Sequence, residues 1–176
     1  MHQISLILCI VLFRAYPKFA VDGMLGKFAK KLRMFGFDTI YLADTDDDAI
    51  IRICSDGKRV FLTKDRELYR RARKANIPCF LITSDNELES LVAIMKECNV
   101  RYVFHVPNEN TRCTLCNGVL EPVSNVLSLA DVVPKKVFES IDIFFKCTNC
   151  QKIYWSGKHV KEINCLVDDI NKKIMV

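Results

Sequence analysis

The sequence predicts an α/β fold, in which a parallel sheet flanked by helices is followed by a small cysteine-containing subdomain. Three observations indicate this fold. Short apolar runs alternate with segments of helical periodicity over residues 18–106, which is typical of parallel strands joined by crossover helices. Aspartates follow four of these apolar runs. Two Cys-x-x-Cys pairs lie in the second half of the chain.

Each apolar run predicts one strand, and each periodic segment predicts one helix. Strands are expected at residues 18–21, 39–43, 60–63, 79–82 and 100–106. Helices are expected from Leu25 to the stop at Gly36, from the Asp46–Asp48 run to about Gly57, over 67–74 and over 88–98. Ser84 and Glu87 match a capping box in front of the last of these helices.

The chain divides into five segments by composition. They are an apolar N-terminal extension (1–17), the sheet domain (18–106), a linker (107–111), the cysteine subdomain (112–165) and a polar tail (166–176). The apolar run at residues 4–13 is too short to span a bilayer as a helix. It has no cationic start and no small-residue cleavage site after it, so we expect an extension rather than a signal peptide, and no membrane association.

The two cysteine pairs predict a structural zinc site. Cys113 and Cys116 form the first pair, and Cys147 and Cys150 form the second. A two-residue gap lets one tight turn present two sulfurs to the same ion, and two such turns complete a tetrahedral site. A pair of redox-active or merely buried cysteines explains one pair better than two. The spacing of the nine cysteines does not suggest a small disulfide framework, so we expect a reducing, cytoplasmic location.

The aspartates that follow the strands predict a second, oxygen-based metal site. Asp22, Asp47, Asp65 and Asp85 each come just after a predicted strand, and the carboxyl ends of parallel strands meet at one edge of a sheet. Crowded carboxylates repel unless a divalent cation neutralises them, and Mg²⁺ or Mn²⁺ prefers oxygen ligands. Each aspartate alone is equally well explained as a turn or helix cap.

The basic residues indicate a polyanionic partner. The net charge is +5, and Lys27 and Arg33 lie on the first predicted helix, beside the acidic edge. A cationic rim next to an acidic metal pocket suits an enzyme that cleaves a polyanion, and we expect Lys27 and Arg33 to bind phosphate. Tyr154 and Trp155, between basic residues after the second cysteine pair, are expected to support the cysteine subdomain rather than to stack on nucleotides.

Several motifs together resemble the Mut-seven C-terminal RNase domain family. The resemblance covers about residues 18–165. It is carried by Phe19-Ala-Val-Asp22-Gly-Met-Leu-Gly-Lys27, by Leu62-Thr63-Lys64-Asp65-Arg66-Glu67-Leu68, and by the segments around both cysteine pairs. It implies a PIN-like nuclease sheet flanked by helices and a C-terminal zinc ribbon. It also implies that Asp22, Asp47 and Asp65 hold Mg²⁺ or Mn²⁺, with Asp85 as a fourth acid.

The expected function is therefore a metal-dependent ribonuclease that hydrolyses RNA phosphodiester bonds, with a structural zinc ribbon that helps to bind RNA. Two alternatives stay open: a non-catalytic RNA-binding zinc-ribbon protein, and a toxin-like regulatory nuclease. The sequence does not decide which of Asp46, Asp47 and Asp48 is the metal ligand. A homo-oligomer is compatible with it.

Overall fold

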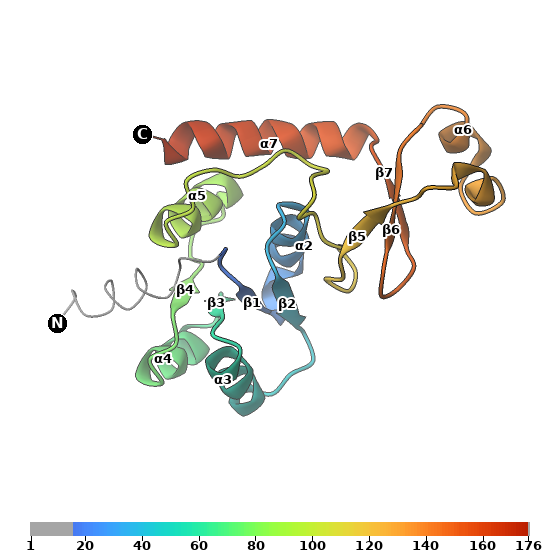
Figure 1. The fold of residues 1–176 in the computed structure, drawn as a ribbon. Coiled ribbons are helices and arrows are strands. Elements are labelled where there is room, and N and C mark those ends of the chain that lie inside the picture. The colour runs from blue at the N-terminus through green and yellow to red at the C-terminus, as the bar shows by residue number, and fades with distance from the viewer. Residues whose placement is uncertain (1–15, 176) are drawn as a thin grey trace.

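A parallel sheet domain and a smaller antiparallel domain are connected by a long C-terminal helix, as Figure 1 shows. The computed structural model describes residues 16–175. The elements of the first domain are β1 Phe19–Asp22, η1 Gly23–Leu25, α2 Gly26–Met34, β2 Thr39–Leu42, α3 Asp47–Asp56, β3 Val60–Thr63, α4 Arg66–Lys74, β4 Cys79–Leu81 and α5 Glu87–Glu97. Those of the second are β5 Leu120–Pro122, η2 Val126–Leu129, α6 Lys135–Phe138, β6 Phe144–Cys147 and β7 Ile153–Trp155, and α7 Lys158–Ile174 closes the chain.

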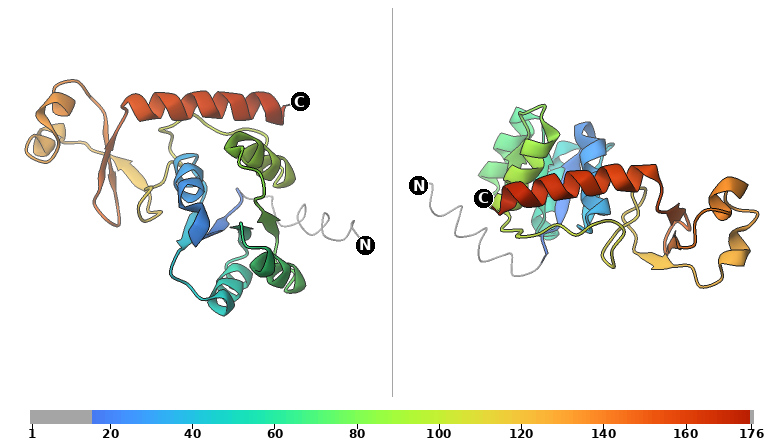
Figure 2. Two further views of the ribbon diagram at one scale, coloured as in Figure 1. Left: turned by 180° about the vertical axis from the view of Figure 1, so that it is seen from behind. Right: turned by 90° about the horizontal axis from the view of Figure 1, so that it is seen from above.

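The four-stranded sheet has the order β2-β1-β3-β4, and every pair is parallel, which confirms the predicted α/β class. The central strands β1 and β3 are completely buried, as expected of a parallel sheet covered on both faces, whereas the edge strands β2 and β4 are partly exposed. One apolar cluster joins the sheet to α2, α5 and α7, and a second joins the opposite face to α3 and α4. Figures 1 and 2 show these three layers.

The order of the strands places β1 and β3 at a switch point. The chain leaves β1 through α2 on one face of the sheet, whereas it leaves β3 through α4 on the other face. In open α/β sheets, a crevice forms where the connections from two neighbouring strands diverge in this way. The residues that end β1 and β3 are therefore the best placed to form a site.

The helix starts follow the predicted cap chemistry, with one exception. Asp46 caps α3 by accepting a hydrogen bond from Ala49 N at 2.9 Å, as its position before an apolar periodic segment suggests. The prediction of a capping box at Ser84 and Glu87 is wrong. Asn86 is the N-cap of α5 and accepts from Glu89 N, while the Ser84 hydroxyl accepts from Asn86 N in the preceding turn.

The predicted fifth strand at 100–106 is also wrong, since this segment has no strand partner. Two asparagines of α7 satisfy its backbone instead. Asn171 accepts a hydrogen bond from Val103 N and donates one to Val103 O, both at 2.8 Å. Asn164 bonds Val106 N and O in the same way, at 2.7 and 2.9 Å. A side-chain amide offers the same donor and acceptor as a neighbouring strand, so an apolar segment can be buried here without joining the sheet.

Helix α7 crosses the boundary that was expected at residue 165. Residues 166–174, expected as a polar tail, continue the helix, and Val167 and Ile170 are completely buried in the first domain. The composition of residues 166–174 is polar on average, but their apolar and charged residues recur at helical spacing, so the segment forms an amphipathic helix. The domain boundaries themselves stay a prediction.

The second domain is a three-stranded antiparallel sheet, β5-β6-β7, that carries a small insertion between β5 and β6. Leu129, Val133 and Phe144 form the core of this insertion and its sheet. No helix in the part of the chain described by the structure is long and apolar enough to cross a membrane. The expected N-terminal extension lies, apart from its last two residues, outside the described part.

The Asn171 bridge leads to a stability prediction. In Asn171→Ala, both backbone groups of Val103 lose their partner while buried, so the free energy of unfolding should fall by about 1–3 kcal/mol. Lys172→Ala, at the exposed neighbouring position, should change it by less than about 0.5 kcal/mol. Equal effects of the two substitutions in urea unfolding would show that the bridge contributes no stability.

Candidate metal centre and active site

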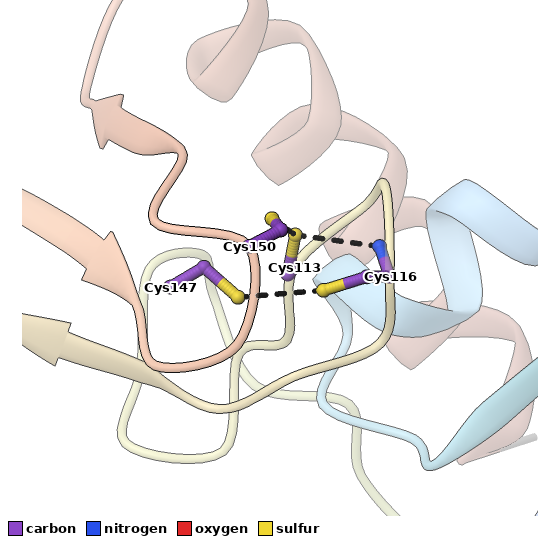
Figure 3. Close-up of side chains that lie close together, drawn as sticks. All are labelled: Cys113, Cys116, Cys147 and Cys150. Atoms are coloured by element: carbon purple, nitrogen blue, oxygen red, sulfur yellow. Dashed lines mark hydrogen bonds between the residues drawn. The ribbon is translucent and has the colours of Figure 1, made fainter.

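Four cysteines converge between the two domains. The sulfurs of Cys113, Cys116, Cys147 and Cys150 all lie within 4.8 Å of one another. Figure 3 shows these four side chains gathered in one place. Cys113 Sγ is 3.5 Å from Cys150 Sγ, and Cys116 Sγ is 3.4 Å from Cys147 Sγ. These distances exceed a disulfide bond of about 2.05 Å but are close to the sulfur–sulfur edge of roughly 3.8 Å in a tetrahedral Zn–thiolate site. The four thiols fit a zinc ion and can hold one.

The two Cys-x-x-Cys turns have the same construction. In each, the residue after the second cysteine adopts a left-handed conformation, with φ of 67° at Asn117 and 61° at Gln151. The N–H of each of these residues donates to the carbonyl of the first cysteine, at 2.9 and 3.1 Å. A Cβ at Gly118 would lie 2.8 Å from Cys147 Sγ, so only glycine lets the turns approach.

Hydrogen bonds prepare the first thiol for metal binding. Burial alone would raise the pKa of Cys113, but the Tyr154 hydroxyl and the N–H groups of Cys116 and Leu115 bring it down to about 6. Tyr154 Oη lies 3.0 Å from Cys113 Sγ and 3.2 Å from Thr114 Oγ1. Tyr154 is half-buried here, in line with the expected supporting role. Thiolates are the ionisation state that zinc requires.

Arg33 joins the first cysteine turn to the sheet domain. Its side chain is buried, and its guanidinium donates to Thr39 O at 2.8 Å, Thr114 O at 2.9 Å and Leu115 O at 3.2 Å. These bonds use Nε and one terminal nitrogen of the guanidinium, and Arg33 also lines the cleft described below, so its binding of phosphate stays a prediction. Burial lowers the pKa of Arg33, while the thiols of Cys113 and Cys116 partly offset this, and an arginine stays charged nonetheless.

Asn117 makes a second connection between the domains. Its side chain accepts from Thr39 N at 2.9 Å and donates to Asp38 Oδ1 at 2.8 Å. Arg59 forms a bidentate pair with the same carboxylate at 3.0 Å. Burial would raise the pKa of Asp38, but the hydrogen bonds from Arg59 and Asn117 lower it below its ordinary value. The first cysteine turn is therefore fixed to the edge strand β2.

Asp22 and Asp65 meet through Thr63 at the ends of β1 and β3. The Thr63 hydroxyl donates to Asp22 Oδ2 and accepts from Asp65 N, the latter at 2.8 Å. Asp22 is buried and also accepts from Met24 N at 2.6 Å and Lys64 N at 3.2 Å. Asp65 is exposed and caps α4. The role of Thr63 was not predicted, although its place between a buried strand and Asp65 is a signal for it.

The other predicted acids lie elsewhere. Asp47 and Asp48, at the start of α3, both pair with Arg71 of α4, Asp47 at 2.8 Å. Asp85 is exposed, 3.8 Å from Lys64 Nζ. Within residues 16–175, the cysteines form the sole group of three or more potential ligands at this separation. The structure thus brings Asp22 and Asp65 together, but not Asp47 or Asp85 with them, and the four-acid site stays a prediction.

An open cleft of about 800 Å³ lies near this edge of the sheet; Asp85 lines it, whereas Asp22 and Asp65 do not. Met24 and Lys64, whose N–H groups bond Asp22, are among its lining residues. Lys27 and Lys30 of α2 line one side and are exposed, whereas Thr114 and Leu115 of the first cysteine turn line another. Lys27, predicted to bind phosphate, is therefore at the cleft.

The metal centre leads to a composition prediction. Purified protein never exposed to chelator should contain about one zinc per chain, as expected of one four-thiolate site. Cys147→Ser should lose the ion and unfold the second domain, because structural zinc contributes on the order of 10 kcal/mol. Cys165→Ser, which changes an exposed cysteine on α7, should keep it. Zinc below a tenth of an equivalent in the parent protein would contradict the assignment.

The Arg33 bridge leads to a second prediction. Arg33→Met leaves the Thr39 and Thr114 carbonyls, one in each domain, without their charged donor. The free energy of unfolding should therefore fall by at least about 2 kcal/mol. Arg33→Lys should recover only part of this, because an ammonium cannot reproduce the guanidinium fork. Lys30→Met, at an exposed position of the same helix, is the control. A similar midpoint for Arg33→Met and Lys30→Met in chemical unfolding would contradict the bridge.

Comparison with known proteins agrees with this architecture. The model of one family, the Mut7-C RNAse domain, matches residues 17–167. No significant match was found among curated proteins, and none among solved structures. The match includes β1, the Thr63–Asp65 turn and both cysteine pairs, and it confirms the resemblance seen in the sequence motifs. The chain belongs to the Mut7-C RNase domain family.

Proposed function

We propose that this chain is a metal-dependent ribonuclease with a PIN-like catalytic domain, and that Asp22 and Asp65 are the centre of its active site. The observation that carries the proposal is that Thr63 links the Asp22 carboxylate to the backbone N–H of Asp65 at the switch point between β1 and β3, so that both aspartates lie at the ends of these strands. The family match supports a nuclease-like function on RNA. The cationic cleft near this edge of the sheet supports a polyanionic substrate.

The residues present fit a hard divalent cation. Mg²⁺ is commonly bound by one or two carboxylates together with waters and substrate phosphates, and Asp22 and Asp65 provide two on neighbouring strands. Such a cation supplies an activated water and stabilises the leaving oxygen in phosphodiester hydrolysis. Asp47 would join them only by giving up its pair with Arg71, and Asp85 by leaving Lys64. Both are therefore secondary members of the proposed site.

The protein's own groups position this site. The Thr63 hydroxyl and the N–H groups of Met24 and Lys64 orient Asp22, while Asp65 is fixed by capping α4. Lys27, exposed on α2 at the cleft, is placed to bind a phosphate of the RNA. The zinc ribbon supports the fold and adds a wall to the cleft. Reduced thiols suit a cytoplasmic location.

One observation favours the alternative of a non-catalytic RNA-binding protein. Asp22 accepts three hydrogen bonds and Asp65 caps a helix, so both carboxylates also have structural tasks. The two functions differ in whether RNA is cleaved when Mg²⁺ or Mn²⁺ is added.

The decisive variants are Asp65→Asn and Asp22→Asn. Each removes a negative charge, so cleavage of single-stranded RNA with Mg²⁺ or Mn²⁺ should fall about a hundredfold or more, which corresponds to ~2.7 kcal/mol of transition-state stabilisation. Asparagine is as good an N-cap as aspartate, so Asp65→Asn should keep its stability. Asp22→Asn loses an acceptor in a buried network and should lose about 1–3 kcal/mol, which requires measurement of its unfolding midpoint.

The control is Asp56→Asn, at the exposed end of α3, which removes the same charge away from the cleft and should cleave like the parent. Undiminished, metal-dependent cleavage by both Asp22→Asn and Asp65→Asn would refute the active-site assignment. Binding of RNA without cleavage by the parent protein would favour the non-catalytic alternative.

A further inference from the structure

The cleft near the ends of β1 and β3 is lined by residues of both domains. η1 and α2 line it from the first domain, and Thr114 and Leu115 of the first cysteine turn line it from the second. Arg33 holds these two parts of the lining together, because it belongs to α2 and donates to the carbonyls of Thr114 and Leu115. The turn therefore lies along the cleft in a fixed position, rather than at the end of a separate arm.

The walls of the cleft expose apolar groups that have no obvious packing task. Met24 is 69 % exposed, Leu115 is 63 % exposed and Tyr41 is 39 % exposed. The Tyr41 hydroxyl donates to Gly23 O at 2.7 Å, which fixes the ring at the edge of the sheet. A Cβ at Gly26 would lie 2.9 Å from the Tyr41 hydroxyl oxygen, so the glycine at the start of α2 makes room for the ring.

The charged groups of the cleft favour an anion. Lys27, Lys30 and Lys64 are exposed cations along it. Two acids also line it: Glu87, which is paired with Lys31 at 2.8 Å, and Asp85, which is 3.8 Å from Lys64 Nζ. Apolar walls alternating with lysines are the combination that binds single-stranded nucleic acid, in which bases stack on rings and phosphates contact cations.

We propose that the first zinc-binding turn is part of the substrate site, and that a single RNA strand lies between this turn and α2. In this arrangement Tyr41, Met24 and Leu115 contact bases, and Lys27 and Lys30 contact phosphates. A cleft of about 800 Å³ is in the size range that encloses a drug-sized ligand, which corresponds to a few nucleotides of one strand. This inference rests on the proposed function, because it takes RNA as the substrate.

The test is RNA binding under conditions without cleavage. A fluorescent twelve-nucleotide oligouridine is titrated with zinc-loaded protein in buffer without magnesium or chelator, and anisotropy gives the dissociation constant. Leu115→Asp removes an apolar contact and adds a negative charge beside the RNA phosphates, so binding should weaken about tenfold, which corresponds to roughly 1.4 kcal/mol. Its matched control is Leu127→Asp in η2, where an exposed leucine that does not line the cleft acquires the same charge; binding there should change less than twofold.

A second pair of variants tests the lysines of α2. The double substitution Lys27→Ala and Lys30→Ala should weaken binding and reduce the slope of log K against log salt by about 1.4, since each phosphate contact on a single strand contributes roughly 0.7. The double substitution Lys172→Ala and Lys173→Ala on α7 removes the same charge elsewhere and should leave the slope within half that change. Zinc content and the unfolding midpoint are measured for every variant.

Three outcomes would overturn the inference. The Leu115→Asp and Leu127→Asp variants could bind the oligouridine equally well, or the protein could bind a blunt RNA duplex of the same length as tightly as the single strand. The third outcome is that the protein binds no RNA. Failure of the proposed function looks different. It appears as tight, Leu115-dependent binding without cleavage when magnesium is added. Cleavage that depends on Asp65 but not on Leu115 would instead retain the nuclease and remove the zinc-binding turn from its substrate site.

Discussion

The contact between Arg33 and the first cysteine turn is the interaction on which the rest of the arrangement depends. A single buried guanidinium joins α2, β2 and the carbonyls of Thr114 and Leu115. Both of these carbonyls lie in the loop between Cys113 and Cys116, so a metal held by the four cysteines and the docking of the two domains would constrain the same few residues. A four-thiolate zinc site carries a formal charge of −2, and a buried cation beside it offsets part of that charge. Removal of the metal would therefore disturb a wall of the cleft as well as the ribbon.

The second constraint is the topology of the sheet. Because α2 and α4 leave β1 and β3 on opposite faces of the sheet, a crevice is expected at the carboxyl ends of these two strands, where Asp22 is buried and Asp65 is exposed. Thr63 then brings Asp22 and Asp65 into one hydrogen-bonded unit. The burial of Asp22 has a cost in desolvation, which its three donors offset. Such a pre-oriented carboxylate is suited to bind a cation with little rearrangement.

Much of this arrangement was predictable from local patterns. The four strands of the sheet and the helices between them follow from apolar runs and periodicity, and the cluster of four cysteines follows from the spacing of Cys113, Cys116, Cys147 and Cys150. The rule that strand ends converge predicts a site at Asp22 and Asp65, and this site stays a prediction. The errors came from long-range partners. Residues 100–106 look like a strand, but the donors and acceptors that satisfy them are on Asn164 and Asn171, more than fifty positions away.

Arg33 shows the same limit at the site. A basic residue on an exposed-looking helix face suggests phosphate binding, yet its partners are carbonyls about eighty residues later, which no local pattern reveals. Asp47 follows β2, as the sequence indicates, but its pair with Arg71 depends on the packing of α3 against α4. Local patterns therefore predict where a residue lies along the chain, whereas they do not reveal a partner that is distant in the sequence.

The central claim is that Asp22 and Asp65 together bind a catalytic cation. Anomalous diffraction from crystals of the zinc-loaded protein soaked in Mn²⁺ tests it most directly. The account predicts two sites: zinc at the four cysteines, and manganese within direct ligand distance of carboxylate oxygens from both Asp22 and Asp65. A fully soaked crystal with a signal at the cysteines and none at the ends of β1 and β3 would contradict it.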